Sequence, residues 1–371
     1  MIAAGGTGGH IFPGIAVARE FLRRDPAVDL LFMGTPRGLE SKIVPREGFR
    51  LEMISIGALK GKSVFQKVKS LVAMPLSFVS ALRALRRFGP NVVIGSGGYA
   101  SGPVLLTAAL MRIPTMLIEP NAMPGFTNRV LARFVDAAAL SFAESMEFFK
   151  GRAVVTGNPV RADFASIAKK ARGAKLNVLV FGGSQGAHAI NVGMVGAAAL
   201  LKERAEGVSI VHQTGEADFQ MVQNGYRDAG FDAADVKPFI HDMFRYFEQA
   251  DVLICRSGAT TAAEVAAAGK AAIFVPFPFA TDDHQRKNAE AFERAGAGRL
   301  ILQKDLTPER LASELIELME NPQEVDRMEA ASRRLAKPDA AQRTVDLAVE
   351  IMNAKGRKPA AGREESGVPG T

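Results

Sequence analysis

One pattern, a short β-rich run followed by a glycine-rich turn and a helix, occurs twice in the chain and decides its fold. The first copy reads Ile2-Ala3-Ala4-Gly5-Gly6-Thr7-Gly8-Gly9-His10, and we expect its helix to begin at Ile11. The second copy begins at Val178 and turns through Gly182-Gly183-Ser184-Gln185-Gly186-Ala187. This unit opens doubly wound α/β domains, so its recurrence predicts two Rossmann-like parallel-sheet domains, one in each half of the chain.

The rest of the chain alternates β-rich runs and helical stretches, as parallel α/β layers do. Strands are predicted at 30–33, 91–94, 115–118, 178–181, 209–212, 252–255 and 271–275. A length of 371 residues suits two hydrophobic cores. We therefore place one domain at 1–157 and another at 158–339, with a surface linker at 169–175. A helix at about 340–354 is expected to pack back on the first domain, before a disordered polar tail at 355–371.

The composition excludes several classes of protein. With 47% hydrophobic and 23% charged residues, the chain is neither wholly disordered nor collagen-like. Its single cysteine, Cys255, forms no internal disulfide and suggests a reducing compartment. No basic, apolar leader precedes Gly5, so we expect the protein to stay in the cytoplasm. The longest uncharged stretch contains glycines and prolines, which argues against a continuous membrane-spanning helix.

The net charge of +7 is concentrated in one part of the chain. No acidic residue lies between Glu52 and Glu119, and that window holds the basic residues Lys60, Lys62, Lys67, Lys69, Arg83, Arg86, Arg87 and Arg112. Apolar residues between these cations follow a helical spacing, and Pro75 is expected to break or kink the segment. A basic, acid-free amphipathic segment at 60–87 suits an anionic bilayer. The alternative is an ordinary core helix with solvated cations.

Nucleic acid is not expected as a partner of this basic segment, because base-stacking aromatic residues are scarce: the chain has no Trp and three Tyr.

Three predicted helix starts are able to bind phosphate, because backbone N–H groups and the helix dipole face the ligand there. They follow Gly5–His10, Gly182–Ala187 and Arg256-Ser257-Gly258. The first turn lacks the Lys-Ser/Thr of a P-loop, and Ile11 occupies the place of the third glycine of a dinucleotide fingerprint. His10 is able to take a proton near neutral pH, although a lone histidine is more often structural.

Two acidic residues allow more than one interpretation. Glu264 lies one turn into the predicted third helix, where it would either bind a sugar diol or simply favour the helix dipole. Glu119 follows the loop Gly95–Pro103 at a distance that loosely fits an NAD-binding pattern. The chain has no Asp-x-Asp pair, so a metal-diphosphate site of that kind is not indicated and helix dipoles would replace the cation.

Taken in order, seven segments resemble the lipid I N-acetylglucosaminyltransferases of peptidoglycan synthesis, the MurG family. They are Gly5–His10, Gly95–Pro103, Glu119–Ala122, Gly157–Arg161, Gly182–Ala187, Cys255–Glu264 and Asp282–Asn288. The resemblance implies the α/β GT-B fold, with two Rossmann-like domains facing across a cleft. It also implies an inverting transfer of GlcNAc from UDP-GlcNAc to the muramyl 4-hydroxyl of undecaprenyl-diphosphate-MurNAc-pentapeptide, which converts lipid I to lipid II.

The same resemblance implies site residues. Donor contacts are expected at Thr7, Gly8, Gly9 and Asn121 of the first domain, and at Arg161, Ser184, Ile240, Ala259, Thr260, Thr261, Ala262, Ala263, Glu264 and Gln285 of the second. Acceptor contacts are expected at Gly97, Gly98, Tyr99 and Ser101. Among the donor residues, Ile240 would bind uracil through its backbone, Glu264 the ribose diol and Gln285 the GlcNAc hydroxyls. His10 is the first candidate for the catalytic base and Glu119 the second.

A member of this family would act in cell-wall synthesis, and hence in cell shape and division. It would lie peripherally on the cytoplasmic face of the plasma (inner) membrane, with UDP-GlcNAc and the lipid-linked muramyl-pentapeptide as substrates and no metal cofactor.

Three alternative functions remain open from the sequence. They are another UDP-sugar transferase of the same fold, an NAD-dependent oxidoreductase built on Gly95–Glu119, and a non-catalytic UDP-sugar or lipid-diphosphate sensor.

Overall fold

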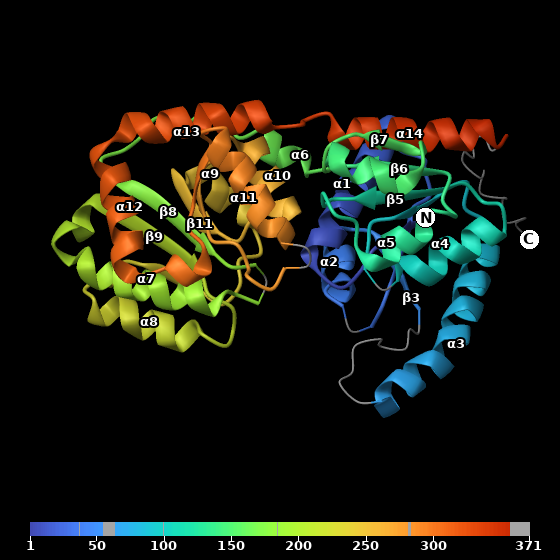
Figure 1. Cartoon of the computed structure of the whole chain (residues 1–371), viewed down its shortest axis with the longest axis horizontal. Coiled ribbons are helices and arrows are strands. Elements are labelled where there is room, and N and C mark those ends of the chain that lie inside the picture. Colours follow the sequence, from blue (N-terminus) through green and yellow to red (C-terminus); the bar gives the residue numbers. More distant parts are fainter. Residues whose placement is uncertain (37, 55–63, 99, 184, 281–282, 357–371) are drawn as a thin grey trace, which may run out of the picture. The chain divides into compact units, whose positions relative to one another are not determined.

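The chain folds into two compact units (Figure 1). A computed structural model describes residues 1–36, 38–54, 64–98, 100–183, 185–280 and 283–356, without the side chains of 64–74. Unit 1 comprises Met1–Pro159 together with the C-terminal part of the chain from Asp339, and unit 2 comprises Val160–Pro338. Each unit contains one parallel β-sheet, so the predicted fold class is confirmed.

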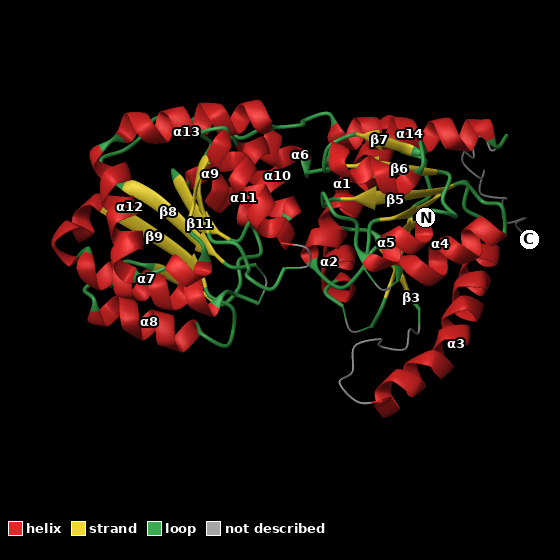
Figure 2. Ribbon diagram, in the orientation of Figure 1, coloured by secondary structure: helices red, strands yellow, loops and turns green. Residues whose placement is uncertain are grey.

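Unit 1 is built on a seven-stranded parallel sheet in the order β3-β2-β1-β4-β5-β6-β7. The strands are β1 (Ile2–Ala3), β2 (Leu31–Gly34), β3 (Arg50–Met53), β4 (Val93–Gly95), β5 (Thr115–Glu119), β6 (Ala137–Leu140) and β7 (Ala153–Val155). The helices are α1 (Gly8–Arg24), α2 (Glu40–Arg46), α3 (Val64–Phe88), α4 (Ser101–Leu110), α5 (Phe126–Leu131), the 3-10 helix η1 (Ala143–Phe149) and α14 (Ala340–Ala354). Figure 2 shows the sheet with helices on both faces.

The short first strand organises this sheet. Ile2 pairs with Phe32 of β2 on one side and with Ile94 of β4 on the other. The strand order reverses between β1 and β4, and ligand loops of doubly wound sheets meet at such a point. The loops that follow β1 and β4 are therefore brought together at the carboxyl edge of the sheet.

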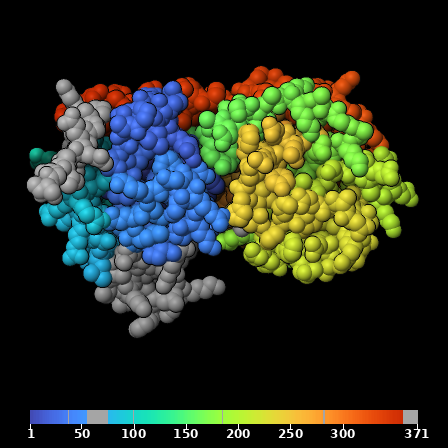
Figure 3. All heavy atoms as spheres, turned by 180° about the vertical axis from the view of Figure 1, so that it is seen from behind, coloured from blue at the N-terminus to red at the C-terminus, as the bar shows by residue number. Residues whose placement is uncertain are grey.

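Because strand residues alternate between the two faces, Ile2 and Ala3 belong to different cores. Ile2 packs in a cluster with Ile15 of α1 and Val345 of α14. Ala3 packs on the other face with Leu105 of α4. The C-terminal helix α14 thus completes one core of unit 1, and Figure 3 shows its red atoms beside blue N-terminal residues.

Unit 2 is built on a six-stranded parallel sheet in the order β10-β9-β8-β11-β12-β13. The strands are β8 (Leu176–Phe181), β9 (Val208–Gln213), β10 (Asp235–Lys237), β11 (Val252–Cys255), β12 (Ala271–Phe274) and β13 (Gly298–Leu300). The helices are α6 (Ala162–Ala165), α7 (His188–Leu200), η2 (Lys202–Gly207), α8 (Phe219–Asp228), α9 (Met243–Gln249), α10 (Ala259–Ala268), α11 (His284–Arg294), η4 (Gln303–Asp305), α12 (Pro308–Glu320) and α13 (Pro322–Leu335). Val178 and Val180 of β8 face one core, and Leu179 and Phe181 face the other.

Two of the predictions need correction. Helix α3 runs from Val64 to Phe88 as one element with Pro75 inside it, so of the expected break or kink the break does not occur. A proline removes one backbone N–H and leaves the hydrogen bonds of the other turns, so a long helix is able to continue past it. In addition, the segment 169–175 is not a linker between domains, because it lies within unit 2.

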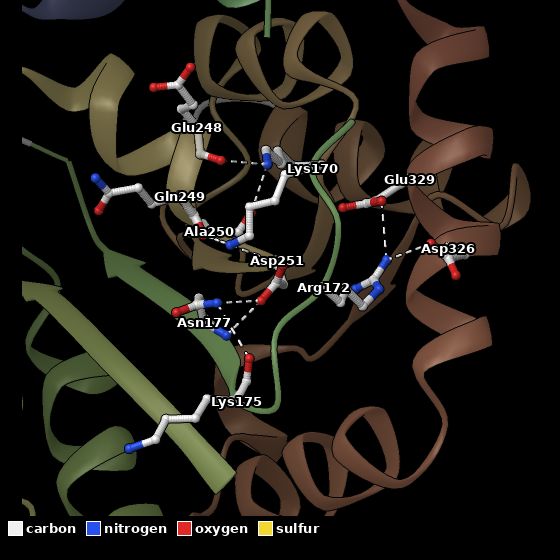
Figure 4. A network of polar contacts seen from close by, with 11 residues as sticks. Lys170, Arg172, Lys175, Asn177, Glu248, Gln249, Ala250, Asp251, Asp326 and Glu329 are labelled. Atoms are coloured by element: carbon white, nitrogen blue, oxygen red, sulfur yellow. Dashed lines mark hydrogen bonds and ion pairs between the residues drawn. The ribbon is translucent and has the colours of Figure 1, made fainter. Parts of the chain in front are cut away.

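Ion pairs anchor that segment to unit 2 (Figure 4). Lys170 Nζ lies 3.4 Å from Asp251 Oδ1, just before β11. Arg172 Nη2 lies 2.9 Å from Asp326 Oδ1 and 3.1 Å from Glu329 Oε2, both on α13. The basic residues of this segment therefore bind it to the domain.

The predicted C-terminal tail begins with an ion pair to unit 1. Of the predicted tail, residues 355 and 356 are described, and Lys355 Nζ lies 2.7 Å from Asp136 Oδ2. The rest of the tail, 357–371, lies outside the described residues. No helix in the described ranges is both long enough and apolar enough to cross a bilayer.

Candidate functional site

The glycine-rich turn after β1 leads into α1 earlier than expected. Helix α1 begins at Gly8, so Gly8, Gly9 and His10 form its first turn. Thr7 is the N-cap residue with an extended backbone, and its side chain makes no capping hydrogen bond. The exposed Thr7 hydroxyl thus lies beside the N-terminal N–H groups of a long helix, an arrangement that suits an anionic or hydroxyl-bearing ligand.

His10 is held in one orientation by its own loop. Its Nδ1 lies 3.3 Å from the carbonyl oxygen of Gly5, and its own carbonyl accepts a hydrogen bond of 2.6 Å from Ser96 Oγ. A carbonyl oxygen only accepts, so the Gly5 contact requires the proton on Nδ1. Nε2 then carries the lone pair, and it has no hydrogen-bond partner among the described residues. Burial lowers the pKa of His10, while the Gly5 bond and the charge of Glu40 oppose that shift.

The loop after β4 packs directly on this turn. Gly97 and Gly98 have φ values of +99° and +83°, in the left-handed region that favours glycine. A Cβ added to Gly97 would lie 2.6 Å from the His10 ring, and one added to Gly98 would overlap the Gly5 carbonyl oxygen. Both glycines are therefore required for the two loops to touch.

Two further residues of this loop were expected to contact the acceptor. Ser101 is fully buried, and its hydroxyl oxygen lies 2.8 Å from the carbonyl oxygens of both Ala3 and Gly97, which share its single hydrogen as acceptors. The Ser101 side chain thus holds the loop on β1, and its expected acceptor contact stays a prediction. Tyr99 lies outside the described residues.

Glu119, the second candidate base, has both carboxylate oxygens engaged. Oε1 accepts from the backbone N–H of Asn121 at 2.9 Å and from Asn121 Nδ2 at 3.1 Å. Oε2 accepts from Asn128 Nδ2 at 2.7 Å. Burial raises the pKa of this carboxyl group, and the hydrogen bonds oppose the shift. Glu119 therefore holds Asn121 and Asn128, whereas His10 Nε2 has no hydrogen-bond partner among the described residues, and both assignments of the base stay predictions.

In unit 2, the second glycine-rich turn packs on the end of β9. Gly183 and Gly186 have φ values of +98° and +76°, and a Cβ on Gly186 would overlap the Thr214 carbonyl oxygen. Helix α7 follows, with Ala187 as its N-cap. Ser184, expected to contact diphosphate, lies outside the described residues.

A residue that the sequence did not single out connects this turn to Ile240. The buried Gln213, at the end of β9, donates from Nε2 to the Gly183 carbonyl at 2.9 Å. Its Oε1 accepts from the backbone N–H of Ile240 at 2.8 Å. One amide side chain thus fixes both the predicted diphosphate turn and the predicted uracil contact.

Helix α10 begins at the other predicted phosphate site. Gly258 is its N-cap, and the first intrahelical bond joins the Ala262 N–H to the Gly258 carbonyl at 2.8 Å. The N–H groups of Ala259, Thr260 and Thr261 therefore lie in the first turn, where a helix has no intrahelical acceptors for them. Ala263 is half-buried on the next turn.

Glu264 on α10 is buried beside a cation. Its Oε1 lies 3.9 Å from Arg161 Nη2, and the Arg161 guanidinium lies over the Phe164 ring at 4.8 Å. Burial raises the pKa of Glu264 to about 7, and Arg161 opposes that shift. The Glu264 carboxyl group is therefore able to change protonation near neutral pH.

Gln285, the predicted contact of the GlcNAc hydroxyls, is tied to the α10 loop. Its carbonyl accepts from Ser257 Oγ at 2.8 Å, and its side-chain Oε1 accepts from the Phe277 N–H at 3.0 Å. These bonds orient the side-chain amide group of Gln285 at the start of α11. The geometry places Gln285 and the first turn of α10 in one connected region of unit 2.

A second residue that the sequence did not single out lies beneath the first turn of unit 1. The Glu40 side chain is fully buried, and its Oε2 accepts from the Gly6 N–H at 2.8 Å. Gly5 and Gly38 leave the room for it, because a Cβ on either would overlap the carboxylate. The sequence signal was a set of glycines far apart along the chain, which only the fold shows to surround one carboxylate.

Both halves of the chain match known domains. Residues 1–140 match the glycosyltransferase family 28 N-terminal domain, and residues 177–344 match the glycosyltransferase family 28 C-terminal domain. The NAD-dependent oxidoreductase considered above therefore has no support from either match.

Several curated relatives are similar over almost their whole length. The chain is 46% identical over 370 residues to a UDP-N-acetylglucosamine–N-acetylmuramyl-(pentapeptide) pyrophosphoryl-undecaprenol N-acetylglucosamine transferase of Anaeromyxobacter sp. (strain Fw109-5), covering 99% of this chain and 97% of the relative. A transferase of the same name from Myxococcus xanthus is 45% identical, with coverages of 95% and 92%.

Solved structures agree with this similarity. The Acinetobacter baumannii MurG crystal structure superposes with a TM-score of 0.73 at 34% identity, covering 94% of this chain and 98% of that one. A UDP-GlcNAc 2-epimerase from Neisseria meningitidis bound to UDP-GlcNAc shares the fold, with a TM-score of 0.67 at 14% identity and coverages of 94% and 99%. By its sequence, its domains and its fold, the chain belongs to glycosyltransferase family 28 and, within it, to the MurG family of N-acetylglucosaminyltransferases.

Proposed function

We propose that this protein transfers GlcNAc from UDP-GlcNAc to the muramyl 4-hydroxyl of undecaprenyl-diphosphate-MurNAc-pentapeptide, converting lipid I to lipid II. The observation that carries the proposal is the near-full-length similarity to transferases of that name. The geometry of each unit is compatible with one of the two substrates. The reaction would supply the disaccharide unit on which cell-wall growth, cell shape and cell division depend.

The donor would bind to unit 2. Arg161 and the first turns of α7 and α10 would hold the diphosphate, since helix N-termini stabilise anions and arginine adds a fixed positive charge. Glu264 would accept hydrogen bonds from the ribose hydroxyls, and the Ile240 backbone would face uracil. Arg161 and the two helix N-termini would neutralise the negative charge of the diphosphate in place of a metal ion, so we propose that transfer needs no divalent cation.

The acceptor would bind to unit 1, at the paired turns of Gly5–His10 and Gly95–Gly98. In the chemical step, the muramyl O4 forms a bond to the anomeric carbon of GlcNAc while the bond from that carbon to the UDP oxygen breaks. The proton of the 4-hydroxyl passes to His10 Nε2, and UDP leaves with the bonding electron pair. Attack on the face opposite UDP inverts the anomeric configuration.

We further propose that unit 1 docks on the cytoplasmic face of the plasma membrane through the segment 60–87. Of this segment, residues 60–63 lie outside the described residues. On the described part of α3, Leu76 and Val79 are 63% and 43% exposed. Arg83 and Arg86 are exposed on the same helical face, at spacings of three and four residues. The opposite face, with Ala81 and Leu85, is buried in the core. A face that is both apolar and basic is typical of a helix that binds an anionic bilayer, so it favours membrane binding over the alternative of an ordinary solvated helix face.

The direct test is an assay with labelled UDP-GlcNAc and lipid-linked muramyl-pentapeptide in detergent, run in parallel with EDTA and with added Mg²⁺. The proposal predicts label in the lipid fraction, and transfer that survives EDTA. No transfer under any lipid or detergent condition would contradict the assigned reaction. Transfer that requires a divalent cation would contradict only the role given to Arg161 and the helix N-termini.

A further inference from the structure

Glu40 is connected to His10 through a single peptide group. The Gly6 N–H donates to Glu40 Oε2 at 2.8 Å. The Gly5 carbonyl, which belongs to the same Gly5–Gly6 peptide, accepts from His10 Nδ1 at 3.3 Å. The two hydrogen bonds therefore form a chain from the Glu40 carboxylate to the His10 imidazole. The N–H of the planar Gly5–Gly6 peptide group bonds the carboxylate, and the C=O of the same group bonds the imidazole N–H.

The carboxylate is fixed independently of this contact. Glu40 Oε1 accepts from the Thr35 backbone N–H and from Thr35 Oγ1, both at 2.8 Å. The Glu40 side chain is fully buried. All three of these groups donate, so the fully buried carboxylate acts as an acceptor behind the turn.

Glu40 is also a charged group that acts on His10. Among the described residues of the two loops, Gly5 contacts the ring through its carbonyl, Gly97 lies beside the ring and Ser96 bonds the His10 carbonyl, and none of these three is charged. Burial disfavours the protonated ring, and the negative charge of Glu40 opposes that effect. The negative charge that would stabilise a protonated His10 is thus separated from its ring by a single peptide group.

We propose that Glu40 is a positioning residue for the base His10, acting through the Gly5–Gly6 peptide group. The inference rests on the proposed function, because it needs His10 to take the proton of the muramyl hydroxyl. The peptide hydrogen bond holds the neutral ring with its proton on Nδ1 and its lone pair on Nε2. When Nε2 takes the substrate proton, both ring nitrogens carry hydrogens, and the Gly5 carbonyl and Glu40 stabilise the imidazolium.

Glu40→Gln tests this role because it keeps the shape and removes the charge. An amide has one acceptor oxygen, so its NH2 group must face either the Gly6 N–H or the Thr35 N–H, donor against donor. We expect kcat to fall by about tenfold or more, with the KM for UDP-GlcNAc unchanged. The acidic limb of the kcat–pH profile should move to lower pH, because the loss of the carboxylate makes the imidazolium less stable.

Two further variants separate this role from a structural one. Glu20→Gln neutralises another buried glutamate of unit 1, on the same helix as His10 but paired with Arg23 and Arg24. It should leave kcat and the pH profile unchanged. Glu40→Asp retains the charge at a shorter reach, so its acidic limb should lie between those of the wild type and Glu40→Gln. Glu40→Asp also provides the test if Glu40→Gln does not fold.

A spectroscopic measurement tests the relay without any turnover. In full-length protein labelled with 15N-histidine, the ring nitrogen shifts report which nitrogen carries the proton, and His10→Asn assigns the signal. We expect the Nδ1–H tautomer in the wild type and a mixture in Glu40→Gln. Unchanged tautomer and unchanged pH profile in Glu40→Gln would overturn the relay, even if His10 proves to be the base. Full activity in His10→Ala would instead overturn the assignment of the base in the proposed mechanism.

Discussion

Ile240 and Gln213 are joined by a buried hydrogen bond of 2.8 Å, in which the Ile240 N–H donates to Gln213 Oε1. The other end of the same side chain donates to the Gly183 carbonyl at 2.9 Å. The amide of Gln213 therefore connects the backbone expected to face uracil with the turn expected to face diphosphate. A substitution at this one buried residue should therefore weaken the binding of both the uracil and the diphosphate of the donor.

Gln213→Met should weaken donor binding, because it leaves the Ile240 N–H and the Gly183 carbonyl without their partner at nearly constant volume. We expect the Kd for UDP-GlcNAc to rise about tenfold, which corresponds to about 1.4 kcal/mol. Isothermal titration calorimetry measures this change. As a control, Asn177→Leu removes the 2.7 Å bond to Asp251 at the opposite end of the sheet (Figure 4). That variant should lower Tm without changing the Kd, and an equal change in both variants would count against the role of Gln213.

Donor affinity should depend on pH through Glu264. Burial raises the pKa of Glu264 to about 7, so the group is mainly neutral at pH 6 and mainly ionised at pH 8. Only the carboxylate accepts from both ribose hydroxyls, so affinity should rise about tenfold between these pH values. UDP-GlcNAc is the right probe because its diphosphate does not titrate in this range. Glu264→Gln should abolish the dependence, and a wild-type Kd that stays flat from pH 6 to 8 would exclude the ribose contact.

The same shift has a consequence for stability without donor. The folded pKa of Glu264 is raised above its ordinary value of 4.5. The folded state therefore binds more protons than the unfolded state between pH 4.5 and about 7. The contribution of Glu264 to the free energy of unfolding must fall as pH rises through that window. A comparison of wild type with Glu264→Gln by urea unfolding at pH 5 and pH 8 should show this difference.

The contact between the two loops of unit 1 should not tolerate a methyl group. Gly98→Ala places a Cβ on the Gly5 carbonyl oxygen and a side chain at φ +83°. We expect a loss of stability of about 1–3 kcal/mol and a clear fall in kcat, since the turn that carries His10 must shift. Gly89→Ala is the matched control, because Gly89 also has a positive φ of +64° but no atom within 4 Å of the added Cβ. If both variants had equal Tm and kcat, the close approach of the loops would not matter.

Membrane binding should depend on the exposed face of α3. Arg83→Glu with Arg86→Glu should reduce sedimentation with anionic vesicles by about tenfold or more, since each cation contributes on the order of 1 kcal/mol near such a surface. Turnover of a short-chain soluble acceptor should be retained. Arg245→Glu with Arg327→Glu changes the net charge equally on exposed helices of unit 2 and should sediment like the wild type. If both double variants lost vesicle sedimentation equally, the α3 face would have no specific role in membrane binding and would be an ordinary solvated surface.

The sequence predicted most of the strands inside the two sheets and missed the strands at their edges. All seven predicted strands are present within two residues at each end. The missed strands β3, β7, β10 and β13 are the short edge strands of the two sheets, and most of their residues are half-buried or exposed, so they lack a long buried apolar run. The missed β6 is fully buried but reads Ala-Ala-Ala-Leu, and alanine has little preference for strands.

The site residues divide in the same way. The glycine turns and His10 were predictable because they directly follow strands, where parallel sheets place their ligands. Glu40 and Gln213 were not, because their partners Gly6 and Ile240 lie far along the chain and meet them only in the folded units. Neither residue has a local pattern that distinguishes it from an ordinary polar residue.

The central claim is that His10 takes the proton of the acceptor hydroxyl during GlcNAc transfer. The most direct measurement is kcat for His10→Ala in the labelled transfer assay, together with its Kd for UDP-GlcNAc. We expect kcat to fall by about a hundredfold or more and the Kd to stay within about twofold of the wild type, because the base acts only in the chemical step. A His10→Ala enzyme with wild-type kcat would contradict the mechanism.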